Sequence, residues 1–150
     1  MLKNLSGGII ARFRNDQVFE IGGAGASLFE YNIETSVSAT SGATTTIGSF
    51  PIALNYCSNV EVSWVASAPD GNCAGGVVHH TIKNVSGTTS AVGTQTAVVR
   101  SNLTSAPSVS IVANDTTDAI DFNFTNGASP DHRAYKVNVT IRLLYTPIAV

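Results

Sequence analysis

Strict alternation of apolar and polar residues is the feature of this sequence that most constrains its fold. From Tyr135 to Leu143 every second residue is apolar or aromatic, and the residues between them are Lys136, Asn138, Thr140 and Arg142. The segments LFEYNIETSV (28–37), NVEVSWVAS (59–67) and AIDFNFT (119–125) alternate in the same way. Because successive side chains of a strand point to opposite faces, each segment predicts a β-strand with one buried and one solvated face.

Turn-forming residues separate the predicted strands and define the fold class. They lie at Asp70-Gly71, Ser86-Gly87, Asn114-Asp115 and Asn126-Gly127. No window of helix length shows a convincing period of 3.6 residues. Short strands joined by polar turns predict an all-β protein, an antiparallel β-sandwich of jelly-roll-like type. Ser86-Gly87, between strands expected at 76–85 and 88–99, predicts a hairpin with a short turn.

The N-terminal segment has a different pattern. IIARFRNDQVFEI (9–21) predicts a small β-hairpin that turns at Asn15-Asp16, and the GGAGAS that follows has the composition of a flexible joint. We therefore expect an N-terminal anchoring arm with its Gly-rich joint at 1–26 and a β-sandwich oligomerisation domain at 27–150. An isolated hairpin is marginally stable in water, so the arm should become ordered by packing on a neighbour. Its expected partner-binding residues are Lys3, Arg12, Phe13, Arg14, Val18 and Phe19.

The charge content predicts a protein that functions in an assembled state. Charged residues make up 12% of the chain, against about 25% in ordinary soluble domains. A surface this poor in charge favours self-association. The net charge of −2 gives no electrostatic footprint for nucleic acid. No run approaches the roughly 18 apolar residues of a membrane span, and no signal-peptide core is evident, so we expect synthesis in a cytosol.

The adjacent residues His79 and His80 invite comparison with a metal site. On a strand their side chains point to opposite faces, so the pair cannot chelate one ion. We interpret one ring as buried and hydrogen-bonded and the other as exposed. A site that combines either ring with His132 or Asp70, or one shared across a threefold axis, stays a minor alternative. The sequence thus predicts neither a metal nor a cofactor.

The sequence gives little support for catalysis, and we expect no enzyme activity. Ser, His and Asp occur, but no G-x-S-x-G elbow is present to expose a nucleophile. Asp115 and Asp118 are interpreted as turn residues that make Asx hydrogen bonds, although calcium binding with Asn114 remains an alternative. Cys57 and Cys73 do not form a C-x-x-C pair, and whether they form a disulfide is left open.

A family resemblance rests on three successive stretches of the body. They are TTTIGSFPIALNYCSNVEVSWVAS from Thr44, HHTIKNVSGTTSAVGTQTAVV from His79, and VSIVANDTTDAIDFNFTNG from Val109. This succession resembles a β-sandwich module of tailed-bacteriophage virion proteins, found in tail fibres, tailspikes and capsid decorations. The resemblance spans about residues 44–145 and implies a trimeric, non-enzymatic virion component. Such modules often carry a Trp in the penultimate strand region, where this chain reads SPDHRAYKVNV.

Together these patterns predict a bacteriophage virion structural protein. It would be an oligomeric appendage, expected as a homotrimer on the virion surface, that decorates and cements the capsid by non-covalent docking. Its partners would be copies of itself and capsid, tail or neck proteins. The alternative is a short tail fibre or receptor-binding protein that recognises host surface glycans. The expected receptor-facing residues are then Asp70, Asn72, Asn126, Asp131 and His132.

Overall fold

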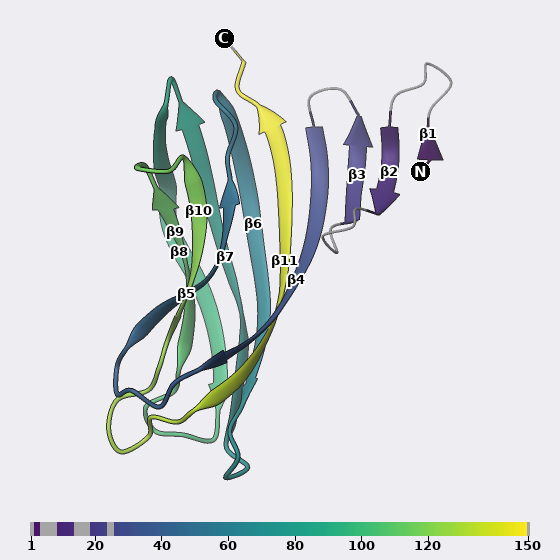
Figure 1. The fold of residues 1–150 in the computed structure, drawn as a ribbon. Coiled ribbons are helices and arrows are strands. Elements are labelled where there is room, and N and C mark those ends of the chain that lie inside the picture. Colours follow the sequence, from purple (N-terminus) through teal and green to yellow (C-terminus); the bar gives the residue numbers. More distant parts are fainter. Residues whose placement is uncertain (1, 4–8, 14–18, 24–25, 150) are drawn as a thin grey trace.

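The computed structural model describes residues 2–3, 9–13, 19–23 and 26–149, with side-chain environments from residue 28 onward. Its described elements are all β-strands, in two antiparallel sheets (Figure 1). The larger sheet has the order β1-β2-β3-β4-β11-β6-β7-β8, and the smaller has the order β5-β10-β9. The strand bounds are β1 Leu2–Lys3, β2 Ile9–Phe13, β3 Phe19–Gly23, β4 Ala26–Val37, β5 Thr44–Pro51, β6 Tyr56–Ser67, β7 Cys73–Val85, β8 Thr88–Ser101, β9 Ser108–Asn114, β10 Ala119–Thr125 and β11 Tyr135–Pro147.

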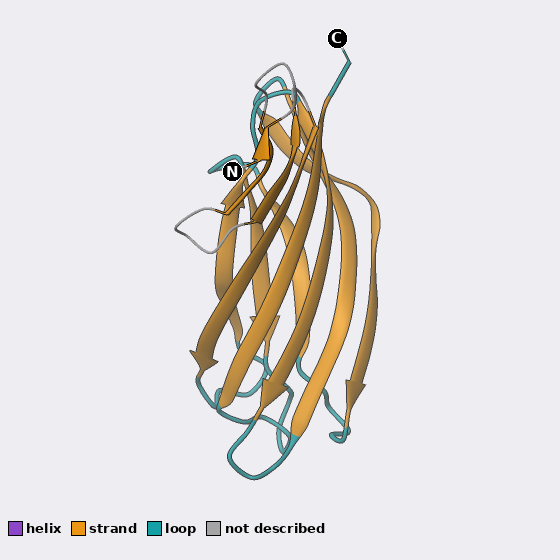
Figure 2. Ribbon diagram, turned by 90° about the vertical axis from the view of Figure 1, so that its right-hand side faces the viewer, coloured by secondary structure: helices purple, strands orange, loops and turns teal. Residues whose placement is uncertain are grey.

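The predicted antiparallel β-sandwich is confirmed. Strands β4–β11 form its body, with five strands in the large sheet and three in the small one. Viewed from the side, the long strands of the large sheet run past one another with a marked twist (Figure 2). That twist is the usual consequence of L-residue backbone sterics. A jelly roll has eight strands in two sheets. Here the large sheet has more of the eight body strands than the small one, because β6, β7 and β8 pair in succession as a meander within the large sheet.

The core lies between the two sheets and is built by the alternation seen in the sequence. In β11 the apolar side chains from Tyr135 to Leu143 are at most 1% exposed, whereas Lys136 and Arg142 are exposed. Trp64 of β6 is 5% exposed and meets Phe124 of β10 edge to face, with ring centroids 6.1 Å apart. Phe124 also packs against Tyr135 at 5.7 Å. This aromatic group connects the two sheets and includes Trp64 in the core.

The predicted hairpin at Ser86-Gly87 is confirmed. These residues join β7 to β8, and both have positive φ, 53° at Ser86 and 83° at Gly87. Two consecutive positive φ values give a primed turn, whose twist matches that of the strands. Further along, His79 pairs with Thr96 but Thr81 pairs with Val92, so β8 carries a bulge opposite His80. Gly93, with φ of 71°, lies in this bulge.

The bulge in β8 connects the two sheets. The side-chain oxygen of Gln95 accepts a hydrogen bond from the backbone N–H of Ile111 in β9, at 2.7 Å. Nδ1 of His80 lies 3.1 Å from the carbonyl oxygen of the same residue. His79 is exposed on the opposite face, with Nδ1 3.9 Å from a carboxylate oxygen of Glu61. The two histidines therefore lie on opposite faces, as expected, and His80 has an architectural role.

The N-terminal hairpin is present and continues the large sheet. Strands β2 and β3 are antiparallel, with Arg12 paired to Glu20 and Phe13 to Phe19. Strand β3 then pairs with the first half of β4, from Ala26 to Glu30. Figure 1 shows β1–β3 to one side of the sandwich, away from the small sheet. The predicted turn at Asn15-Asp16 lies outside the described residues, and the division into an arm and a body stays a prediction.

Candidate functional site

Four loops meet at one end of the sandwich, which we call the loop end. They are residues 38–43, 68–72, 102–107 and 126–134, and each connects two body strands. Backbone hydrogen bonds connect neighbouring loops: Gly42 donates to Gly127 at 3.0 Å, and Asn126 donates to Ala43 at 2.9 Å. The first and last of these loops are therefore held against each other by their own backbones. Four of the five expected receptor-facing residues lie here with at least partial exposure.

Asp70 is the most highly connected exposed side chain of the loop end. Its carboxylate accepts a hydrogen bond from Nε of Arg133 at 2.5 Å, and one from Nδ2 of Asn72 at 2.8 Å. The bond to Arg133 is the main cause that lowers the pKa of Asp70, with Asn72 adding to it. The same ion pair raises the pKa of Arg133. This charge-assisted contact connects two loops that are 63 residues apart in the chain.

Asn126 is not receptor-facing, which corrects the sequence expectation. It is 3% exposed, and its Nδ2 donates to the carbonyl oxygens of Arg133 at 2.7 Å and Ser38 at 3.0 Å. Its side-chain oxygen accepts from the N–H of Arg133 at 3.3 Å. The Asn-Gly pair predicted an exposed tight turn. Instead the loop folds inward and the amide satisfies buried backbone groups.

Asp131 and His132 are half-buried in the same loop. A carboxylate oxygen of Asp131 accepts from the N–H of Ser105 at 2.7 Å, which connects the 126–134 loop to the 102–107 loop. Nδ1 of His132 is buried and has no hydrogen-bond partner among the described residues. On the other side, Nδ2 of Asn102 donates to the side-chain oxygen of Asn72 at 2.9 Å. The expected receptor-facing residues did not include Arg133, Asn102 or Ser105. Arg133, which has the formal positive charge in the SPDHRAY stretch, offered the clearest signal.

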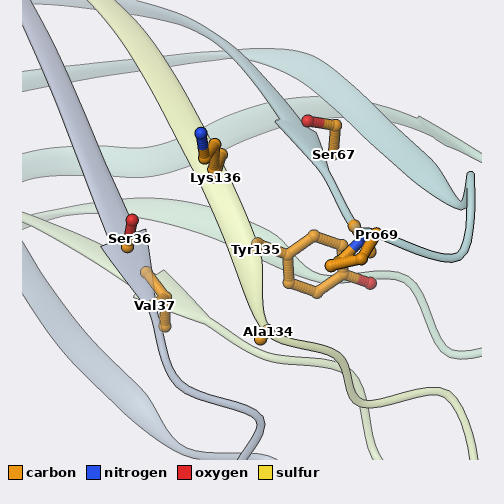
Figure 3. Close-up of a pocket in the computed structure, with 8 residues that line it drawn as sticks. Ser36, Val37, Ser67, Pro69, Ala134, Tyr135 and Lys136 are labelled. Carbon is orange, nitrogen blue, oxygen red and sulfur yellow. The ribbon is translucent and has the colours of Figure 1, made fainter.

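A pocket of about 360 Å³ opens beside the loop end (Figure 3). Most of its lining is apolar and comes from Val37, Ala68, Pro69 and Tyr135, and the polar side chains on it are Ser36, Ser67 and Lys136. In β11, Lys136 pairs with Ser36 on one side and Ser67 on the other, so these three lie in one row across the sheet. The hydroxyl of Tyr135 is buried without a hydrogen-bond partner in the described part of the chain. A pocket of this size suits one small group, such as a single sugar ring.

The acidic residues at the opposite end of the sandwich are structural. Asp115 accepts from the N–H of Thr89 at 2.6 Å, and Asp118 accepts from its hydroxyl at 2.9 Å. The Asx turn there is made by Asn114, whose side-chain oxygen accepts from Thr116 and Thr117. This corrects the expectation that the two aspartates make it. Both cysteines are free thiols, and their positions near opposite ends of β6 and β7 prevent a disulfide between them.

Side-chain clusters that hold metal ions are absent from the described ranges: no group of three or more His, Cys, Asp or Glu residues converges there. Among the same residues, no helix is long and apolar enough to cross a membrane. The expected absence of a cofactor and of enzyme activity stays a prediction. The hydrogen bonds of the loop end hold side chains in fixed positions, an arrangement suited to binding.

The residues expected to bind a virion partner lie on the N-terminal strands. Lys3 is in β1, Arg12 and Phe13 are in β2, and Phe19 is in β3. Arg14 and Val18 lie outside the described residues. The register places Phe13 and Phe19 directly opposite each other, so the structure brings these two together. Their role as a docking surface stays a prediction.

Comparison with known proteins shows no family for this chain and only a distant structural likeness. No family model matches the chain, and no curated protein matches it. Among solved structures, it is similar to the tailspike protein of Acinetobacter baumannii phage AM24, with 9% sequence identity and a TM-score of 0.40. The match covers 79% of this chain and 26% of the tailspike chain, so the chain spans about a quarter of that protein. A likeness this distant carries no argument about function.

Proposed function

We propose that this protein is a structural component of a bacteriophage virion, an oligomeric appendage on its exterior that decorates and cements the capsid. The sequence resemblance to virion β-sandwich modules motivates the proposal. In it, the N-terminal strands dock on a capsid, neck or tail protein, and the sandwich projects from the particle. Docking is non-covalent, through apolar and small polar side chains with Arg12 and Arg14 reaching acidic groups.

One structural observation carries the proposal: β1–β3 extend the large sheet beyond the part that the small sheet covers. Of β4, strand β3 pairs with Ala26–Glu30 alone, and β1 lies at the outer edge of the sheet. A short meander without a facing sheet lacks the second layer that would normally stabilise it. A second protein that packs on these strands would supply that layer. The geometry therefore suits an anchor.

The charge distribution of the sandwich supports a protein that works in an assembly. On the outer face of the large sheet, Arg142 of β11 pairs with Glu30 of β4 at 2.9 Å and with Glu61 of β6 at 3.6 Å. Large apolar side chains are exposed on the same sheet, including Val65 at 54% and Leu144 at 53%. A neighbouring protein that packs on these side chains would bury apolar area, and Arg142 is already paired with both carboxylates on this face.

A particle-binding assay tests the proposal. The full chain and a version lacking residues 1–26 are each mixed with virions depleted of the protein and sedimented. We expect the full chain to co-sediment and the shortened chain to remain in the supernatant while keeping its β-sheet circular dichroism. Arg12→Glu/Arg14→Glu should weaken binding, whereas Lys83→Glu, a charge change of the same kind on β7, should not. Equal co-sedimentation of all forms would contradict anchoring through the arm.

A second candidate function is receptor binding by the loop end. It is favoured by the fixed loop network around Asp70 and by the adjacent pocket at Pro69 and Tyr135. Glycan-array binding by the purified protein, lost in Asp70→Ala and kept in the exposed control Glu34→Ala, would support this function. Binding to capsids with no response on the array would favour decoration.

A further inference from the structure

We propose that the second half of β8 is a contact through which two copies of this chain pair edge to edge. The segment is Thr96–Arg100, which we call the open edge segment. It lies at the end of the large sheet, where β8 pairs with β7 on one side only. This inference goes beyond the proposed function, because it concerns the chain's contact with itself and holds whether or not the protein belongs to a virion.

Exposure on both faces distinguishes this segment from β6 and β11, the central strands of the large sheet. Every residue from Thr96 to Arg100 is exposed, including Val98 at 57% and Val99 at 37%. Successive residues of a strand point to opposite faces, so two adjacent exposed valines mean that neither face is covered. In β6 and β11, by contrast, one face is buried throughout. A strand exposed at both faces and at its edge lacks the cover that apolar residues normally receive.

The edges formed by β9 and β5, the outer strands of the small sheet, are protected. At the edge of β9, the backbone N–H of Ile111 donates to the side chain of Gln95, and its carbonyl oxygen lies next to the ring of His80. These backbone groups are therefore already occupied. Strand β5 carries an irregularity between Gly48 and Thr46 in its pairing with β10, and it ends in Pro51. Bulges and prolines are common means by which edge strands avoid pairing with other chains.

The first half of β8 is protected in a similar way. The backbone N–H of Thr89 donates a hydrogen bond to Asp115, and its hydroxyl donates one to Asp118. The bulge at Gly93 then interrupts the ladder. Beyond the bulge, from Thr96 to Val99, no hydrogen bond other than the pairing with β7 joins the segment to a described residue. The open edge segment therefore offers an unprotected row of backbone donors and acceptors.

The charge pattern identifies the occupant as a second copy of the chain. The segment is uncharged except for Arg100, so an identical antiparallel strand meets no repulsion near its centre. A twofold axis at Val98 places Val98 opposite the partner's Val98 and Arg100 opposite the partner's Thr96. This register opposes no two arginines. The contact is isologous, the commonest arrangement in homo-oligomers.

This geometry also bears on the number of copies. An isologous edge contact joins chains in pairs, so it favours a dimer or an even multiple over the homotrimer that the family resemblance implies. The open edge segment and β1 lie at opposite edges of the large sheet. Pairing through β8 would therefore leave the N-terminal strands available to a different partner. A contact only a few residues long is small, and the dimer should be weak.

Sedimentation of the full chain tests the pairing. We expect a reversible monomer–dimer equilibrium between about 1 µM and 1 mM, the range of a small interface. Val98→Lys places two ammonium groups close together across the axis and should raise the dimer dissociation constant at least about tenfold, the effect of a loss of about 1.4 kcal/mol. Leu144→Lys, which introduces the same charge at a similarly exposed apolar residue on the same face but within β11, should leave it unchanged. Thermal unfolding confirms that both variants fold.

Disulfide trapping gives an independent readout. In a Cys57→Ser/Cys73→Ser background, Val98→Cys should form a covalent dimer on mild oxidation, and Leu144→Cys should not. A wild-type chain that stays monomeric over the whole concentration range would overturn the proposal. So would a trimer, or a dimer that Val98→Lys leaves intact and Val98→Cys fails to trap.

Discussion

Gln95 and Ile111 connect the two sheets of the sandwich, because the side-chain oxygen of Gln95 accepts a 2.7 Å hydrogen bond from the backbone N–H of Ile111. Replacing Gln95 with Leu keeps the size of the side chain but leaves that N–H without its acceptor. We expect the free energy of unfolding to fall by about 1–3 kcal/mol, the cost of a buried unsatisfied donor. Urea unfolding measures it, with Thr94→Val as the control. A loss below about 0.5 kcal/mol would show that water or another group replaces the glutamine.

The buried amide of Asn126 should matter still more for stability. It bonds the carbonyls of Ser38 and Arg133 and the N–H of Arg133, so Asn126→Ala removes three interactions at once. We expect a loss of about 2–4 kcal/mol in the free energy of unfolding. Asn72→Ala, at a less buried position of the loop end, should cost less than half as much. Equal losses at the two sites would contradict a structural role specific to Asn126.

The ion pair of Asp70 and Arg133 predicts a pH dependence of known sign. Because Arg133 lowers the pKa of Asp70 in the folded protein, the pair contributes stability above the ordinary aspartate pKa of 3.8. That contribution is lost as the pH falls through the lower folded-state pKa. The stability difference between the wild type and Asp70→Asn should therefore be constant near neutral pH and begin to shrink only as the pH falls below about 4. A difference that instead disappears near pH 6 would assign the effect to a histidine.

Hydrogen exchange of the N-terminal strands tests their dependence on a partner. In the purified protein we expect the amides of β2 and β3 to exchange faster than those of β6 and β11, which lie at the centre of the large sheet. Adding depleted virions should slow exchange in β2 and β3 while leaving the central strands as they were. Protection equal to that of the central strands without any partner would contradict the anchoring role.

Much of the fold was predictable because a half-buried strand requires apolar and polar residues to alternate along the sequence. The alternation from Tyr135 to Leu143 predicted both the strand and its buried face, and Ser86-Gly87 predicted its hairpin. Which strands share a sheet was not predictable, since β11 lies between β4 and β6, far from both in sequence. Strand β8 likewise shows no clear alternation of apolar and polar residues, because its second half is exposed on both faces and neither face requires apolar side chains.

The candidate site was only partly predictable, for a physical reason that Asn126 illustrates. Loop polarity indicates where turns occur, but it does not distinguish an amide facing water from one that bonds buried carbonyls. Asn126 bonds Ser38, 88 residues away, and no local pattern encodes that contact. Asp70 and Asn72 lie at the loop end because a turn between two strands must lie at the edge of a sheet. Arg133, which bonds Asp70, belongs to a loop that is distant in the sequence.

Localisation on the particle tests the virion proposal most directly. A gold-labelled tag fused after residue 150 would be imaged by negative-stain electron microscopy on virions assembled with the tagged protein. We expect gold at regular positions on the exterior of the capsid, neck or tail, and loss of that label when residues 1–26 are removed. Particles without bound label, alongside tagged protein that remains entirely in the unassembled fraction, would contradict it.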